Sequence, residues 1–183
     1  PQMVASSINE TNEMTGNKSL FVNCVMSTSN TKVSPVIDLQ RVSAFTIQNR
    51  INQPSVSDVN YVSDTTNVGT SSAASYLTKP VILENLSTAI DVRLTSNIRS
   101  TSSVEVYFRT TSSEEARNIN DLSWIPFNTT GTSDTTVTPA EDNETFKEYK
   151  YSVSGLNEFT AFQIKIVMKG TNSAYAPVIK DMR

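Results

Sequence analysis

The stretch "SSVEVYFRTT", residues 102–111, decides the fold class of this chain. Its side chains alternate in character, with Val104, Val106 and Phe108 on one side and Glu105, Tyr107 and Arg109 on the other. Alternation with a period of two places successive side chains on opposite faces of an extended strand. The stretch therefore predicts a half-buried strand of an antiparallel sheet.

The same alternation recurs on both sides of this stretch. In "STAIDVRLTSN", residues 87–97, Ile90, Val92 and Leu94 are expected to face inward. In "FTAFQIKIVMKG", residues 159–170, the inward positions are Phe162, Ile164, Ile166 and Met168. Further strands are predicted in residues 19–26, 36–47, 76–84, 145–155 and 176–183, and the one helix-like stretch is residues 112–122.

Together these patterns predict an all-β fold, an antiparallel β-sandwich of jelly-roll type with about eight strands and two long loops. The two loops are residues 52–75 and the irregular region that begins near Trp124. Residues 1–17 are polar without alternation and are expected to form an N-terminal arm. Residues 18–183 are expected to form a single β-sandwich domain.

Composition agrees with this fold class. Only 18% of the residues are charged, which is a low share. The chain is instead rich in Ser, Thr and Asn, which suit strands and turns. The net charge of −3 without a basic cluster argues against nucleic-acid binding. No apolar run is long enough for membrane insertion. The single cysteine, Cys24, cannot form an internal disulfide and is expected to be a buried, inert thiol.

The chemistry of common active sites is missing from the sequence. The chain has no histidine, which excludes Ser-His-Asp and Cys-His nucleophiles and the commonest zinc sites. Carboxylates cluster in polar loops, where solvated acids are the ordinary outcome; a calcium site in residues 133–144 is the weaker interpretation. No catalytic, cofactor-binding or metal-binding residue is predicted, and the chain is expected not to be an enzyme. The clusters are Asp58 with Asp64, Glu114 with Glu115, and Asp134 with Glu141, Asp142 and Glu144.

Aromatic side chains supply the candidate contact sites. The residues that could contact a glycan or a protein partner are Trp124, Tyr61, Tyr76 and Tyr175. For Trp124 the favoured interpretation is structural, because large aromatics such as Trp124 and Phe127 often close one end of a sandwich. Three more tyrosines alternate with charged residues and are expected to form cross-strand pairs rather than a partner contact: Tyr107, Tyr149 and Tyr151.

A short motif occurs twice. "SPVID", residues 34–38, is echoed by "APVIKD", residues 176–181. Proline cannot donate to a sheet ladder, and β-branched residues fit a pleated, buried surface. Both segments are therefore expected to be strand entries, although the repeat is too short to establish a duplicated fold.

Several longer segments carry a family resemblance. They are "SPVIDLQRVSAFTIQNRIN", "YLTKPVILENLSTAIDVRLTSNIRSTSSVEVYFRT" and "FKEYKYSVSGLNEFTAFQIKIVMKGTNSAYAPVIKDMR". In order and motif they resemble virion structural proteins of contractile-tailed phages, especially the myovirus type that infects marine cyanobacteria. The resemblance covers most of residues 33–183, and its motifs are structural rather than catalytic.

The resemblance implies a place in the phage particle, in the tail baseplate or in the tail-fibre attachment region. The expected partners are other tail or baseplate proteins, or further copies of this chain, with the protein made in the host cytoplasm and then built into the virion. The alternative expectation is a carbohydrate-binding module that contacts host surface glycans. A glycan-cleaving enzyme is the least favoured, since it would need two carboxylates placed across a sugar.

Overall fold

The computed structural model describes residues 23–40, 51, 55–172 and 175–183. The chain divides into two compact units, residues 1–47 and residues 48–183. In the first unit, the described residues 23–40 are exposed and consist of turns and irregular backbone. All eight strands of the described residues belong to the second unit.

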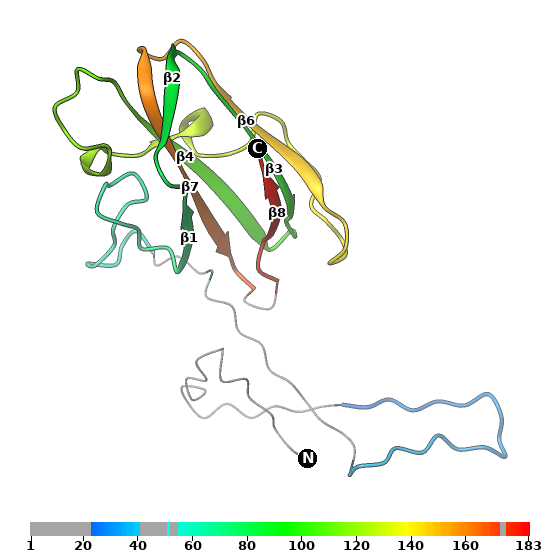
Figure 1. The fold of residues 1–183 in the computed structure, drawn as a ribbon. Coiled ribbons are helices and arrows are strands. Elements are labelled where there is room, and N and C mark those ends of the chain that lie inside the picture. Colours follow the sequence, from blue (N-terminus) through cyan, green and yellow to red (C-terminus); the bar gives the residue numbers. More distant parts are fainter. Residues whose placement is uncertain (1–22, 41–50, 52–54, 173–174) are drawn as a thin grey trace. The chain divides into compact units, whose positions relative to one another are not determined.

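The eight strands form two antiparallel sheets (Figure 1). Sheet A contains β1, β2, β4, β5 and β7, and sheet B has the order β6-β3-β8. The strands are β1 (Ala74–Leu77), β2 (Val81–Ser87), β3 (Ile90–Asn97), β4 (Ser102–Thr111), β5 (Ile125–Pro126), β6 (Lys147–Val153), β7 (Phe159–Gly170) and β8 (Val178–Met182). Two short 3₁₀ turns, η1 (Ile119–Asp121) and η2 (Phe127–Thr129), flank β5.

The core lies between the two sheets. The expected inward residues Val92 and Leu94 of β3 and Val106 and Phe108 of β4 are all buried in one apolar cluster. Ile166 of β7 joins the same cluster, so the inward faces predicted from alternation are confirmed. The all-β, antiparallel class is also confirmed, whereas the jelly-roll order of strands stays a prediction.

Strand β7 is the centre of sheet A. It pairs along most of its length with β4, from Ser102 opposite Gly170 to Thr111 opposite Ala161. Its other edge pairs with β1 near one end and with β2 near the other. The predicted strand over residues 76–84 is therefore two strands, because Pro80 between them has no N–H to donate to β7.

The two strands predicted before residue 50 are not found where they can be checked. Residues 23–26 and 36–40 are exposed and contain no strand, and the rest of both segments lies outside the described residues. Cys24 is exposed rather than buried, so the predicted inert core thiol is wrong. Apolar alternation marks a segment as able to pair, but it does not supply the partner strand that pairing requires.

The stretch predicted to be helix-like, residues 112–122, has less helical structure than its length suggested. It contains only η1, and the cap is Asn118, whose side chain accepts a hydrogen bond from the backbone of Asn120. Ser112 begins a separate turn, closed by a hydrogen bond from Glu115 N–H to the carbonyl of Ser112. Residues 112–122 therefore form short hydrogen-bonded turns and no longer helix.

Candidate functional site

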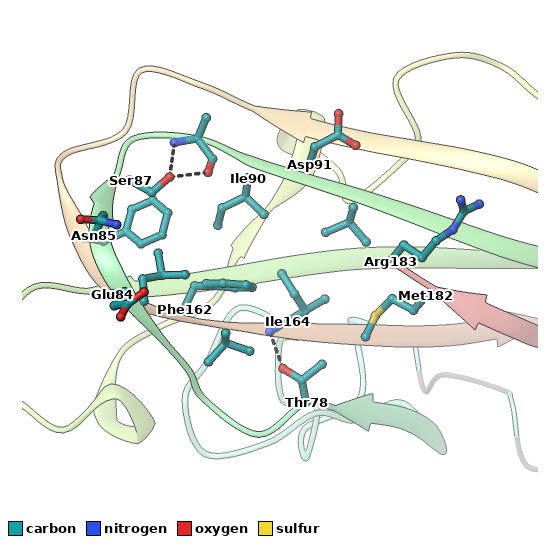
Figure 2. A pocket seen from close by; sticks show the side chains of 15 residues that line it. Thr78, Glu84, Asn85, Ser87, Ile90, Asp91, Phe162, Ile164, Met182 and Arg183 are labelled. Atoms are coloured by element: carbon teal, nitrogen blue, oxygen red, sulfur yellow. Dashed lines mark hydrogen bonds between the residues drawn. The ribbon is translucent and has the colours of Figure 1, made fainter.

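An apolar groove opens between the two sheets, where β2 and β8 lie at their edges. Its cavity has a volume of about 550 Å³. Figure 2 shows Ile90 of β3 and Ile164 of β7 pointing into the space between the sheets, with Met182 entering it from the end of β8. Phe159, Phe162, Val81 and Leu83 complete the apolar walls.

The groove is open because the strands at its sides are incompletely paired. β2 pairs with β7 through Val81, Ile82 and Ser87 only, and the register shifts between Ile82 and Ser87. On the other side β8 pairs with β3 along one edge, and within the described residues no strand pairs with its second edge. A shifted register on one side and an end strand on the other leave the space between the sheets accessible.

Large apolar side chains are also exposed on the two edge strands. Val81, Ile82 and Leu86 on β2 and Val178 on β8 are all exposed, and Ile82 has 82% of its surface accessible. Val81 lines the groove, whereas Ile82, which pairs with Ala161, projects to the outer face of sheet A.

Asp91 and Arg183, two charged groups at the rim of the groove, are bound by neighbours on their own sheet. Asp91 lies 3.5 Å from Arg93 and 3.3 Å from Lys150. Arg183 lies 2.7 Å from Glu148. Since these charges are already compensated, the groove offers a partner mainly apolar contact and the backbone groups of β8.

The outer face of sheet A is covered over β4 and β7, whereas Leu77 on β1 and Ile82 on β2 are exposed on the same face. Residues 55–73 fold over it and bury Lys165, which is 1% exposed, together with Asp64. Lys165 Nζ donates to the backbone oxygen of Asp64 at 2.8 Å and lies 3.8 Å from its carboxylate. Burial lowers the pKa of Lys165, and the Asp64 carboxylate opposes that shift.

The ion pairs continue outward from this buried lysine. Lys169 lies 3.4 Å from Asp64 and 2.6 Å from Glu105. The phenol of Tyr107 donates to Glu105 at 2.6 Å, and burial with that hydrogen bond raises the pKa of Tyr107. The network ties the covering loop to β4 and β7, and each described charge in it has an opposite charge beside it.

Trp124 belongs to this covered face. It is 3% exposed, and the guanidinium of Arg109 lies 4.1 Å from its ring centre. Arg109 also donates to Gln163 on β7 at 2.8 Å and 2.6 Å, and burial lowers its pKa. The structural interpretation of Trp124 is therefore right about its burial but not about its position. It lies under the loop, whereas Phe127 lies between the sheets against Phe108.

The other three candidate contact residues do not gather at one place with Trp124. Tyr61 is half-buried in the covering loop, and Tyr76 on β1 is exposed. Tyr175 is exposed, and its ring lies 4.9 Å from the guanidinium of Arg99. None of the four lines the groove.

The three strand tyrosines pair across strands as expected, and all three are buried. Tyr149 and Tyr151 of β6 are buried in the core between the sheets, opposite Leu94 and Val92 of β3. Burial raises the pKa of Tyr151. Tyr107 is buried too, on the covered face. Tyr149 and Tyr151 pair across strands as expected and point into the core, while Lys150 between them lies on the solvent side.

The loop carboxylates are dispersed or locally bound. Asp64, expected to be solvated, is buried beside Lys165, while Asp134 accepts hydrogen bonds from Asn128 and Ser152. In the described residues, no three side chains of the metal-ligating types come together.

Sequence reasoning missed the groove, and the signal that could have found it was the apolar run "PVILENL", residues 80–86, which lacks strict alternation.

No protein-family model, curated protein or solved structure matches the chain. In the part of the chain that the structure describes, no helix has the length and apolar character to cross a membrane.

Proposed function

We propose that this chain is a non-enzymatic structural component of a phage tail, a β-sandwich module of the baseplate or of the tail-fibre attachment region. The observation that carries the proposal is the open apolar groove beside β2 and β8, two edge strands that also expose large apolar side chains. Proteins that assemble into larger particles leave such surfaces for their neighbours. The resemblance to tail structural proteins is the reason for proposing a phage tail as the larger particle.

A carbohydrate-binding module is the alternative, and it would use an exposed ring beside polar side chains. Trp124, the largest aromatic candidate, is buried under Arg109 and the loop. The groove itself has apolar walls, which suit protein side chains better than sugar hydroxyls. These two observations favour protein assembly.

Cross-linking of purified phage particles, followed by mass spectrometry of the linked lysines, tests the proposal. Lys79 and Lys180 are exposed near the two sides of the groove and are expected to link to other tail proteins. Lys165 is buried and serves as the internal control, because it should not react.

Two results would count against the proposal. One is the absence of the chain from purified particles. The other is linkage confined to Lys147 and Lys150, which lie on β6 at the far edge of sheet B. Binding of the isolated chain to host surface glycan, without any link to tail proteins, would favour the alternative.

A further inference from the structure

The free edge of β8 has backbone groups directed away from its partner strand. Arg183, just after β8, exchanges two hydrogen bonds with Arg93 of β3, at 2.7 Å and 2.8 Å. In an antiparallel pair, the residue next to such a bonded pair points its N–H and C=O to the other side. Met182 therefore directs its backbone to the free edge of sheet B, while its side chain lines the groove.

A segment of the same chain has the pattern of a strand but no place in either sheet. "VSPVIDL", residues 33–39, is described as irregular backbone and turn, with Val36 92% exposed and Leu39 76% exposed. If the segment is extended, its odd-numbered residues form one wholly apolar face, and the other face carries polar residues and Val36. The apolar face consists of Val33, Pro35, Ile37 and Leu39.

The sequence of β8 has the same pattern as this segment. In the echo "APVIKD", Pro177 is buried, Val178 is exposed and Ile179 is half-buried. The segment "SPVID" repeats this order at Pro35, Val36 and Ile37. A second strand of the same pattern beside β8 would present its alternate apolar residues to the same core.

We propose that residues 33–39 of a second copy of this chain dock as an added strand at the free edge of β8. Ile37 and Leu39 enter the groove, and Val36 and Asp38 stay on the solvent side. Strand addition satisfies the backbone groups of an edge while side chains fill the adjoining pocket. The inference deepens the proposed assembly function and rests on it, since it names the partner of the groove.

Disulfide trapping between copies tests the contact. In a Cys24→Ser background, a Leu39→Cys copy is mixed with a Val81→Cys copy and oxidised. A disulfide-linked dimer that joins the two variants is expected. In the matched control, a Val59→Cys copy takes the place of the Val81→Cys copy and should give no such dimer. Val59 is another exposed valine of the second unit.

Sedimentation velocity tests which face of the segment is used. Ile37→Lys is expected to weaken self-association roughly tenfold or more, because it replaces an apolar side chain that the proposed contact buries. Val36→Lys adds the same charge one residue away, on the solvent side, and should leave the association unchanged. Both positions lie outside the two sheets, so circular dichroism should show both variants folded.

Three results would overturn this inference. They are equal effects of the two lysine variants, no mixed disulfide, or an equal yield of mixed disulfide with the Val59→Cys control. None of these results touches the cross-linking of the chain in phage particles. Failure of the strand contact is therefore distinguishable from failure of the proposed tail function.

Discussion

The two sides of the sandwich differ in how their edge strands are covered. At the β4 edge of sheet A, β5 and the carbonyl of Gly131 occupy the outer edge of the strand, and the covering loop places a buried ion pair on its outer face. At the β2 and β8 edges, apolar side chains are exposed around a groove. A charged pair is therefore buried on the covered side, whereas apolar side chains are exposed on the open side.

The largest expected effect lies on the closed side. Asp64→Ala leaves Lys165 buried beside backbone oxygens without its carboxylate partner. Breaking a buried ion pair in this way costs about 3–5 kcal/mol in the free energy of unfolding. Urea denaturation measures the loss. Asp91→Ala, which removes an exposed ion pair on sheet B, is the matched control and should cost about 1 kcal/mol or less. Equal losses would mean that the covered face is no more stabilising than the surface.

A second substitution tests how tightly the β4 edge is closed. Gly131 has a φ of 82°, and a Cβ there would lie 2.9 Å from the Cβ of Glu105. Gly131→Ala is expected to cost about 2–4 kcal/mol from backbone strain and crowding together. Gly155 has a φ of 71° with open space around it, so Gly155→Ala should cost only about 1–2 kcal/mol. Thermal unfolding of the two variants compares them, and a similar shift for both would argue that the Gly131 loop can move away.

The buried tyrosine of the core gives a pH-dependent prediction. Because the pKa of Tyr151 is raised in the folded state, its contribution to stability is complete below pH 10, its unfolded value, and is lost as pH rises above it. The loss is at most about 1.4 kcal/mol per pH unit for one such group. Tyr151→Phe should therefore flatten the decline of stability between pH 10 and pH 11.

Urea denaturation over that range measures this slope for both proteins. Lys165, whose pKa is lowered, acts in the opposite sense below its unfolded value of 10.5, where stability rises with pH. Its contribution is common to both proteins and cancels in the difference between them. An unchanged slope in the variant would contradict burial of the Tyr151 phenol.

The smallest effect on stability is expected at the open side. Ile82→Ser removes an apolar side chain that is 82% exposed, so the free energy of unfolding should change by less than about 0.5 kcal/mol. Chemical denaturation at low protein concentration, where copies do not associate, is the measurement. A loss above about 1 kcal/mol would show that the isolated chain covers this edge itself.

Sequence alternation was enough to predict the inner faces of the sandwich. In β3, β4 and β7 the strict period of two predicts which side chains face the core, and Leu94, Val106 and Ile166 lie there. The same period could not predict the covered outer face of sheet A. Alternation separates two faces of a strand, but it does not say which distant loop covers the second one, and Lys165 meets Asp64 across 101 positions of sequence.

The groove was harder to predict for a related reason. Its walls come from β2, β3, β7 and β8, and it exists because β2 loses register after Ile82. A shift of register depends on how two strands meet, which neither strand encodes alone. For the same reason residues 36–40 carry a strand pattern without forming a strand, since pairing needs a partner as well as a pattern.

The central place of β7 has a consequence for how the chain folds during its synthesis. Among the described residues, β1 and β2 pair only with Phe159–Gly170, and β4 pairs with the same strand along most of its length and with β5 at two positions. Until the ribosome has released that strand, these earlier strands have exposed edges and no sheet to join. Sheet A therefore completes after translation has passed residue 170, and the growing chain depends on its many polar Ser and Thr residues to stay soluble until then.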